Sequence, residues 1–335
     1  MNLLFELSKE HNALPRDEAI SCLKAEEVFY NKVASNEDVL VIKSDAAHDK
    51  IKRIAERLSF TFFIDELLFS CSTSLKEINK CAEDNAIYSK GSIAINYKNR
   101  STYTDSQPIV KTLAEVYTKD KPVDFNNPDL EMRVLITDTN VYVGLKIAEV
   151  QRNKFEKRKV QYRPFFSPIS LHPKLARALV NLSCIKRNET LLDPFCGTGG
   201  ILLEAGLIGA RVIGSDIEEK MIEGSKKTLD FYNLKNYKLI CSDIGKINNY
   251  VNSVDAVVTD LPYGKSTTTK GENIKSLHTR AFQNISQVLK KNGLAIIGLL
   301  GKDMLTIGEK YFSLLNNYEH KVHRSLTRYF AVFQR

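Results

Sequence analysis

The chain has 335 residues, of which 43% are hydrophobic, 26% charged and 9% aromatic. At about 150 residues per domain, this length predicts two domains rather than one core. The composition is close to the globular average, which excludes collagen-like, low-complexity and disordered proteins. We find neither a window of about 18 apolar residues nor a basic leader followed by a long apolar run, so we expect a soluble, cytoplasmic protein.

The six cysteines are scattered, with no CxxC pair and no histidine cluster beside them, so we expect neither a metal site nor disulfides. The net charge of +8 suggests a polyanionic partner. Residues 1–145 hold 18 basic and 23 acidic side chains, residues 146–163 hold 7 and 2, and residues 164–335 hold 23 and 15. Attraction of nucleic acid through bulk charge is therefore expected at the connector and the C-terminal part.

The first 145 residues predict a mixed α/β region. Helix-like patterns cover residues 14–27, 49–58 and 108–119, and strand-like patterns cover residues 37–44, 92–97, 132–138 and 141–148. We expect two small units here, with a break near residues 60–70.

A basic connector rich in aromatic residues, QRNKFEKRKVQYRPFFSP, follows this region, and we expect the domain boundary there. Its candidates for phosphate contacts are Lys154, Lys157, Arg158, Lys159 and Arg163. An ordinary solvated linker is the alternative.

The remaining residues alternate regularly between strand and helix. Strands are predicted at 190–195, 211–217, 237–243, 255–261 and 294–301, helices at 172–184, 201–209, 218–233, 276–291 and 302–317, and a hairpin at 320–334. Repeated strand–helix–strand units predict a mostly parallel sheet covered on both faces. Ligands of such sheets bind beyond the carboxyl ends of the strands, where the strand order reverses.

A glycine-rich turn lies in LLDPFCGTGGILLEA, residues 191–205, between a predicted strand and a predicted helix. This arrangement directs backbone N–H groups at one point and suits a nucleotide-like ligand, although an ordinary tight turn is the alternative. The dinucleotide fingerprint GxGxxG is not met, because its third glycine would fall at Leu202, and no GK[ST] phosphate loop follows.

Four successive strands end in aspartate, at Asp193, Asp216, Asp243 and Asp260. Asp216 lies about twenty residues after the glycine turn, the spacing of an acid that binds a ribose diol. Asp243 is placed to accept a hydrogen bond from an adenine amino group. A single aspartate could be a helix cap, but four at one sheet edge favour a binding crevice.

These motifs resemble those of class I S-adenosylmethionine-dependent methyltransferases that methylate amino groups. DPFCGTGG resembles their cofactor loop, and DLPYG resembles a variant of their (Asp/Asn)-Pro-Pro-(Tyr/Phe) motif. Together with RPFFSPISLHPKLARALVNLS and SLTRYFAVFQR, they resemble the archaeal tRNA guanosine-10 N2-methyltransferases. Upstream, VDFNNPDLEMRVLITDTNVYVGLKIAE is similar to the end of a THUMP domain, an RNA-binding module.

The resemblance implies an α/β chain with a ferredoxin-like unit at 1–60, a THUMP domain at 61–149, a basic linker at 150–170 and a methyltransferase domain at 171–335. That last domain would be Rossmann-like, with a mostly parallel seven-stranded sheet and a terminal antiparallel hairpin. The implied cofactor is S-adenosylmethionine, and the residues expected to bind it are Asp193, Cys196, Gly197, Thr198, Gly199, Asp216, Ile217, Asp243 and Ile244.

The implied activity is methylation, once or twice, of the exocyclic N2 of a guanosine in tRNA, at position 10. Asp260 and the carbonyl of Leu261, which replaces the first proline of the motif, would accept the N–H bonds of the target amino group as positive charge grows. Pro262 biases Leu261 toward an extended conformation, which preserves the carbonyl direction. Tyr263 would stack on the base.

Several partners and alternatives accompany this interpretation. Arg324 and Arg328 flank the final hairpin turn and are further candidates for RNA contact. Eukaryotic members of the family act with a small zinc-binding activator, so the resemblance implies such a subunit as a second partner besides tRNA. The alternatives are an N6-adenine DNA methyltransferase, which the THUMP-like segment disfavours, and an inactive RNA-binding protein with a methyltransferase fold, which the intact acidic strand ends disfavour.

Overall fold

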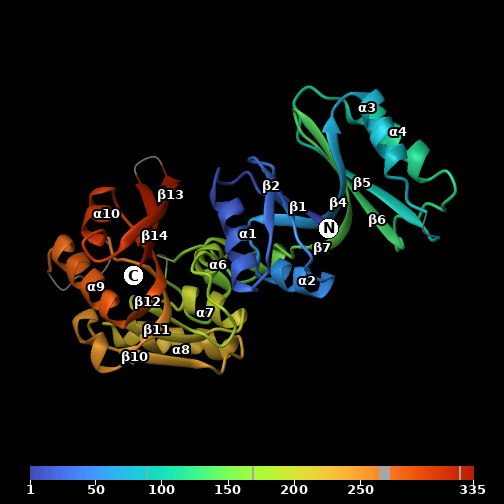
Figure 1. Cartoon of the computed structure of the whole chain (residues 1–335). Coiled ribbons are helices and arrows are strands. Elements are labelled where there is room, and N and C mark those ends of the chain that lie inside the picture. Colours follow the sequence, from blue (N-terminus) through green and yellow to red (C-terminus); the bar gives the residue numbers. More distant parts are fainter. Residues whose placement is uncertain (89, 168–169, 264–271, 324–325) are drawn as a thin grey trace. The chain divides into compact units, whose positions relative to one another are not determined.

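The computed structural model describes residues 1–88, 90–167, 170–263, 272–323 and 326–335. The chain forms two compact units (Figure 1). Unit 1 comprises Met1–Lys9, Val28–Ala55 and Thr61–Val150, and unit 2 comprises Glu10–Glu27, Glu56–Phe60 and Gln151–Arg335. The first 60 residues are therefore shared between both units. None of the helices in the described ranges is long and apolar enough to span a bilayer.

Unit 1 is built on one seven-stranded sheet with the order β2-β3-β1-β4-β7-β6-β5. Neighbouring strands are antiparallel except for β5 and β6. The elements are β1 (Asn2–Leu7), β2 (Asn31–Ser35), β3 (Val39–Lys43), α2 (His48–Arg57, whose last two residues belong to unit 2), β4 (Thr61–Ser72), α3 (Leu75–Asp84), β5 (Ile93–Asn99), α4 (Ser106–Tyr117), β6 (Leu130–Ile136) and β7 (Asn140–Glu149).

Strand β4 runs through residues 60–70, where the sequence suggested a break. It pairs with β1 on one side and with β7 on the other, so a single sheet crosses the expected boundary. The sequence analysis also missed β1, β2 and α3. Strand β2, NKVAS, is polar and exposed at the sheet edge, and such a strand has little hydrophobic alternation to reveal it.

Unit 2 contains the second sheet and most of the helices. Its elements are α1 (Leu14–Ala25), α5 (Asn153–Glu156), η1 (Val160–Tyr162), α6 (Pro173–Leu182), β8 (Thr190–Asp193), α7 (Gly200–Leu207), β9 (Arg211–Asp216), α8 (Glu219–Phe231), β10 (Tyr237–Cys241), η2 (Ile244–Asn249), β11 (Val254–Asp260), α9 (Ile274–Val288), β12 (Leu289–Leu299), α10 (Asp303–Gly308), β13 (Ser313–His323) and β14 (Leu326–Gln334).

The sheet of unit 2 has the order β10-β9-β8-β11-β12-β14-β13. Strands β8 to β12 pair in parallel, and β14 is inserted antiparallel between β12 and β13. The predicted parallel sheet with a closing antiparallel hairpin is thus confirmed. The strand order reverses between β8 and β11, so Asp193 and Asp260 end the two strands at the switch point, where ligands of such sheets bind.

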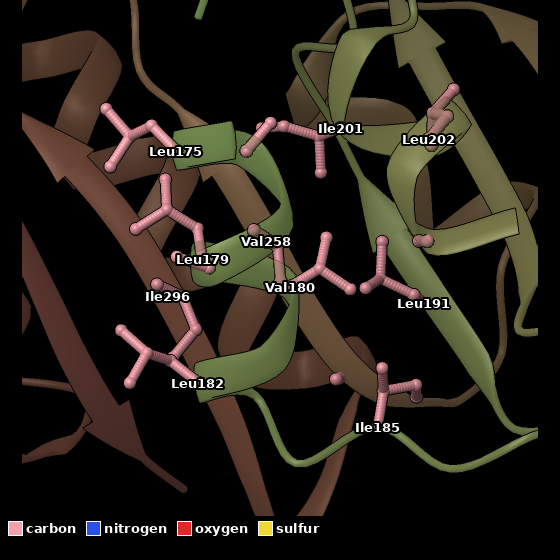
Figure 2. Close-up of a cluster of buried hydrophobic side chains, with 14 of the residues drawn as sticks. Leu175, Leu179, Val180, Leu182, Ile185, Leu191, Ile201, Leu202, Val258 and Ile296 are labelled. Atoms are coloured by element: carbon pink, nitrogen blue, oxygen red, sulfur yellow. The ribbon is translucent and has the colours of Figure 1, made fainter. Parts of the chain in front are cut away.

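Hydrophobic side chains of α6 and α7 pack against this sheet (Figure 2). Leu179 of α6 and Leu202 of α7 are fully buried, together with Leu191 of β8, Val258 of β11 and Ile296 of β12. Burying such a side chain contributes about 1.5–3 kcal/mol. This core holds the strand ends, and therefore the switch point, in place.

Two C-terminal elements differ from the prediction. The helix expected at 302–317 is only α10, and the chain then enters β13, because Ser313–His323 pairs along its length with β14. Helix α9 ends at Val288, before the predicted end at residue 291, and Asn292 lies inside β12 with a φ of 62°. Tertiary pairing overrides the local helical pattern at both places.

Helix α1 belongs to unit 2 through a buried carboxylate. Glu18 is 0% exposed. It accepts hydrogen bonds from the Ser59 backbone N–H (2.9 Å) and hydroxyl (2.6 Å), the Phe60 N–H (2.8 Å) and the Asn181 amide (2.8 Å). Burial raises the pKa of this carboxyl. A fragment that begins at residue 164 would lack α1 and leave Asn181 of α6 without this partner.

We predict that Glu18→Ala lowers the free energy of unfolding of the full chain by about 3 to 5 kcal/mol, because several buried donors lose their acceptor together. Glu18→Gln, which keeps one carbonyl oxygen, should lose less. Urea titration of both variants measures the effect. A loss below about 1 kcal/mol for Glu18→Ala would contradict the importance of this carboxylate.

Candidate active site

A cavity of about 540 Å³ lies at the carboxyl ends of β8, β9, β10 and β11. Its volume is within the range of small-molecule sites, about 300–1,000 Å³. Every residue expected to bind the cofactor lines it except Gly199, and all four residues of the Asp-Leu-Pro-Tyr segment line it as well. The structure thus brings together two motifs that lie more than sixty positions apart (Asp193 and Asp260) in the sequence.

The glycine turn is held in a conformation that favours glycine. Gly197 has a φ of 50° and Gly199 a φ of 76°, both in the left-handed region. The Gly197 N–H donates to Asp216 at 3.0 Å, and its carbonyl accepts from the Ser225 hydroxyl at 2.7 Å. A Cβ on Gly199 would lie 3.0 Å from the Ser225 oxygen. Ser225, on α8, is a supporting residue that the sequence analysis missed.

Two other residues of the turn pack against their surroundings. Cys196 is buried, with its Sγ 3.9 Å from the Ser225 hydroxyl, and burial raises the pKa of its thiol. A buried thiol with a raised pKa is a packed residue of the turn rather than a nucleophile. The Thr198 hydroxyl lies 3.0 Å from that of Ser170, which itself lines the cavity.

Asp216 and Asp243 have different electrostatic environments. Asp216 accepts from the N–H groups of Gly197 and Glu218, both at 3.0 Å, and burial raises its pKa. Asp243 is bound by both Nη atoms of Arg280, at 2.6 and 3.2 Å, and this guanidinium lowers its pKa. Arg280 also contacts Glu272 at 2.6 Å, another cavity residue. No motif in the sequence indicated Arg280 or Glu272.

Asp193 is almost fully buried, with 1% of its surface exposed. It accepts from the Thr259 hydroxyl at 2.7 Å and from the Phe195 N–H at 3.2 Å. Burial, with smaller contributions from Asp216 and Asp260, raises its pKa to about 7. Asp193 therefore resists ionisation in the folded protein.

Asp260 ends β11 beside the cavity. Its Oδ1 accepts from the Tyr263 hydroxyl, and its Oδ2 lies 3.4 Å from Nη1 of Arg328. Burial raises the pKa of Asp260 to about 6, and Arg328 opposes the shift. The carboxylate packs over Gly298 of β12, where a Cβ would lie 2.2 Å from Oδ1. A glycine is therefore required at position 298 for this placement.

Backbone contacts hold the two residues that follow. Leu261 is 1% exposed, and its N–H donates to the Gly298 carbonyl at 3.1 Å. The Pro262 carbonyl lies 3.1 Å from Nε2 of His278, a buried residue of α9. The leucine thus contributes an N–H and a packed side chain that a proline could not, which the sequence analysis did not foresee. Gly264 of the motif lies outside the described residues.

The expected RNA contacts in the connector must be corrected in part. Arg158 and Arg163 are buried, and Arg158 binds Glu204 of α7 at 2.8 and 2.9 Å, so neither is available to phosphates. Lys154 is half-buried and donates to the Glu56 carbonyl at 2.7 Å, and burial lowers its pKa to about 8.

The remaining RNA candidates have different surroundings. Lys157 is exposed, and Lys159 contacts Glu156 at the surface. Arg328 is directed at Asp260 rather than at solvent. Arg324 lies outside the described residues. Within the described parts of the chain, no group of three or more His, Cys, Asp or Glu side chains could hold a metal ion.

Comparison with known proteins places these features in a family. Residues 160–329 match the RMKL-like methyltransferase domain, and residues 27–227 match a DNA methylase family, a match that ends before Asp260. The tRNA (guanine(10)-N2)-dimethyltransferase of Methanothermobacter thermautotrophicus is 32% identical over 340 residues, covering 100% of both chains. The protein of that name from Methanocaldococcus jannaschii is 31% identical over 99% of each.

The sheet order and the acidic cavity at its switch point define a Rossmann-like methyltransferase. The crystal structure of TrmN from Thermus thermophilus has the same fold, with a TM-score of 0.58, 17% identity and 100% coverage of both chains. More particularly, the chain belongs to the tRNA (guanine(10)-N2)-dimethyltransferase family. The resemblance to the archaeal tRNA guanosine-10 N2-methyltransferases is confirmed, and the THUMP domain stays a prediction from the sequence.

We predict that Asp193→Asn stabilises the protein in a pH-dependent manner. The folded pKa of about 7 exceeds the ordinary value of 3.8, so the stability that Asp193 contributes is lost as pH rises from 4 toward 7. The advantage of the asparagine variant should grow over this interval to about 2 to 4 kcal/mol and stay constant above it. Urea unfolding without cofactor at pH 5 and pH 8 measures it; equal differences at both pH values would contradict the assignment.

We also predict that Leu261→Pro destabilises the chain by about 2 to 3 kcal/mol, because it removes the N–H bond to Gly298 and a packed side chain. The methylation rate of the folded protein should stay within about threefold, since the carbonyl is kept. Urea unfolding and single-turnover methylation separate the two effects. A rate loss as large as that of an Asp260 variant would mean that more than the carbonyl is needed.

Proposed function

We propose that the chain transfers a methyl group from S-adenosylmethionine to the exocyclic N2 of guanosine 10 in tRNA, once or twice. The observation that carries the proposal is the carboxylate of Asp260, largely buried at the switch-point cavity and followed by Leu261, Pro262 and Tyr263. Membership of the family, with matches over the whole chain, supports tRNA as the substrate and N2 of guanine as the target.

The cavity residues fit S-adenosylmethionine. A Cβ on Gly197 would meet nothing within 4 Å, so the turn leaves open space beside a backbone that can approach a ligand closely. Asp216 would hold the ribose diol, and Asp243 the adenine amino group, with the walls completed by Ile217 and Ile244. When bound, S-adenosylmethionine supplies an electrophilic methyl group.

The chemical difficulty lies in the nucleophile. The lone pair of the guanine amino group is delocalised into the ring, which makes the nitrogen a poor nucleophile. As the nitrogen forms its bond to the methyl carbon and the sulfonium S–C bond breaks, it gains positive charge, and it loses one proton after S-adenosylhomocysteine has become the leaving group. Asp260 would accept one N–H of this group and the Leu261 carbonyl the other, and both acceptors stabilise the growing charge. The charged form of Asp260 is the better acceptor, so methylation should rise with pH through its pKa of about 6.

Tyr263 would hold the base itself. Its ring is half-buried beside Asp260, and an aromatic face there suits a guanine taken out of its stack. Unit 1 would serve as the THUMP-type RNA-binding module together with a ferredoxin-like part, and the exposed Lys157 of the connector would add a phosphate contact. Cytoplasmic location and a zinc-binding activator stay predictions from the sequence.

We predict that Asp260→Ala lowers the single-turnover rate of tRNA methylation about 10²- to 10⁴-fold, with tRNA affinity nearly unchanged. Asp260→Asn, which keeps one acceptor oxygen, is the matched control, and its rate should lie between those of the parental protein and Asp260→Ala. Radiolabelled S-adenosylmethionine with tRNA transcripts and, in a separate reaction, with DNA, followed by nucleoside analysis, measures rate and product. Product formed on adenine in DNA instead of guanine in tRNA would overturn the proposal, and a rate within about tenfold would remove Asp260 from it.

A further inference from the structure

Both oxygens of the Asp260 carboxylate already have partners within unit 2. Oδ1 accepts from the Tyr263 hydroxyl, and Oδ2 lies 3.4 Å from Nη1 of Arg328. The Arg328 guanidinium carbon also lies 4.9 Å from the centroid of the Tyr263 ring, a cation–π distance. The three side chains therefore contact one another in pairs.

A target amino group that donates to Asp260 must displace one of these partners. Tyr263 follows the end of β11, outside any helix or strand, and its hydroxyl can leave Oδ1 by side-chain rotation. Arg328 lies on β14, whose neighbouring residues Tyr329 and Phe330 pair with β12. The Arg328 side chain is only 12% exposed, so the surrounding residues enclose it. The arginine therefore has less freedom to leave than the tyrosine.

We propose that Arg328 is a positioning residue of the methyl-transfer site, which stays on Oδ2 of Asp260 while the Tyr263 hydroxyl gives up Oδ1 to the amino group of the base. This inference rests on the proposed function. Arg328 keeps the carboxylate charged and oriented at the moment when it loses its other partner. The released tyrosine ring keeps the guanidinium beside it and is free to lie against the base.

This role differs from the phosphate contact suggested by the sequence. A residue that binds RNA phosphates should change tRNA affinity and its dependence on salt. A residue that acts through Asp260 should change the rate and its dependence on pH, because loss of the cation raises the pKa of the carboxyl. Among the described residues, the ionisable groups facing Asp260 are Arg328 from β14, Tyr263 from the adjoining loop and Asp193 from β8, and His320 of β13 lies opposite Arg328 in the strand pair.

Single-turnover methylation of tRNA by Arg328→Gln and Arg328→Lys, from pH 5 to pH 9, tests the inference. We expect Arg328→Gln to methylate tRNA about 10- to 100-fold more slowly at pH 7. The acidic limb of its pH–rate profile should move upward by about one pH unit. Arg328→Lys, which restores a cation, should recover part of both. Affinities for tRNA and S-adenosylhomocysteine should stay within about threefold. Lys321→Gln, on the exposed surface of β13, is the charge-matched control and should keep the parental pH profile.

The same change in the Asp260→Asn background separates a specific role from general damage. If Arg328 acts through the carboxylate, Arg328→Gln should lower the methylation rate of the Asp260→Asn protein only slightly. If the two residues act independently, their fold-losses in rate should multiply. An unchanged pH profile, or a loss confined to tRNA affinity with a smaller salt dependence, would overturn the inference. A thermal melt of each variant identifies misfolding. If Arg328→Gln is misfolded, the pH profile of Arg328→Lys tests the inference instead. Failure of the parental protein to methylate tRNA would instead reject the proposed function.

Discussion

A carboxylate at the end of β11 must stay charged in a place that the fold keeps largely free of water. Burial raises the pKa of Asp260 to about 6, and among the described residues only the Arg328 cation opposes this shift. Removing the burial would admit water to the reacting groups, and removing the cation would favour the neutral acid. Three features of the sheet place this carboxylate. They are the strand order, the absence of a side chain at Gly298 and the antiparallel insertion of β14.

The four aspartates at the strand ends have different surroundings, which give identical side chains different pKa values and different roles. Asp193 is enclosed and resists ionisation, while Asp216 organises the glycine turn through backbone N–H groups. Asp243 is held by Arg280, and Asp260 is shared by a tyrosine and an arginine. Burial dominates for three of them, and an ion pair dominates for Asp243.

The sequence revealed the parts of this site that local pattern encodes. Strands rich in apolar residues, the glycine turn and the aspartate that ends each strand are all contiguous signals, and the parallel topology follows from their alternation. Arg280 and Arg328 could not be recognised in this way, because the partner of Arg280 lies 37 positions away and the partner of Arg328 lies on β11, beyond the intervening strand β12. Arg158 was wrongly predicted to contact phosphates, because a run of basic residues has the same sequence pattern whether its side chains face solvent or a buried glutamate.

The attachment of α1 to unit 2 has a consequence for the order of events during synthesis. The hydrogen bond from Asn181 to Glu18 cannot form until Asn181 is synthesised, 163 residues later in the chain. At about 5 to 20 residues per second, a ribosome needs roughly 8 to 30 s to supply it. Strand β1 precedes Glu18 and strands β2 to β7 are made in that interval, so this sheet can close before α1 packs against α6. For those seconds the nascent chain exposes apolar side chains of α1, such as Leu14 and Leu23, that are buried in the folded protein, and such surfaces are what holdase chaperones cover.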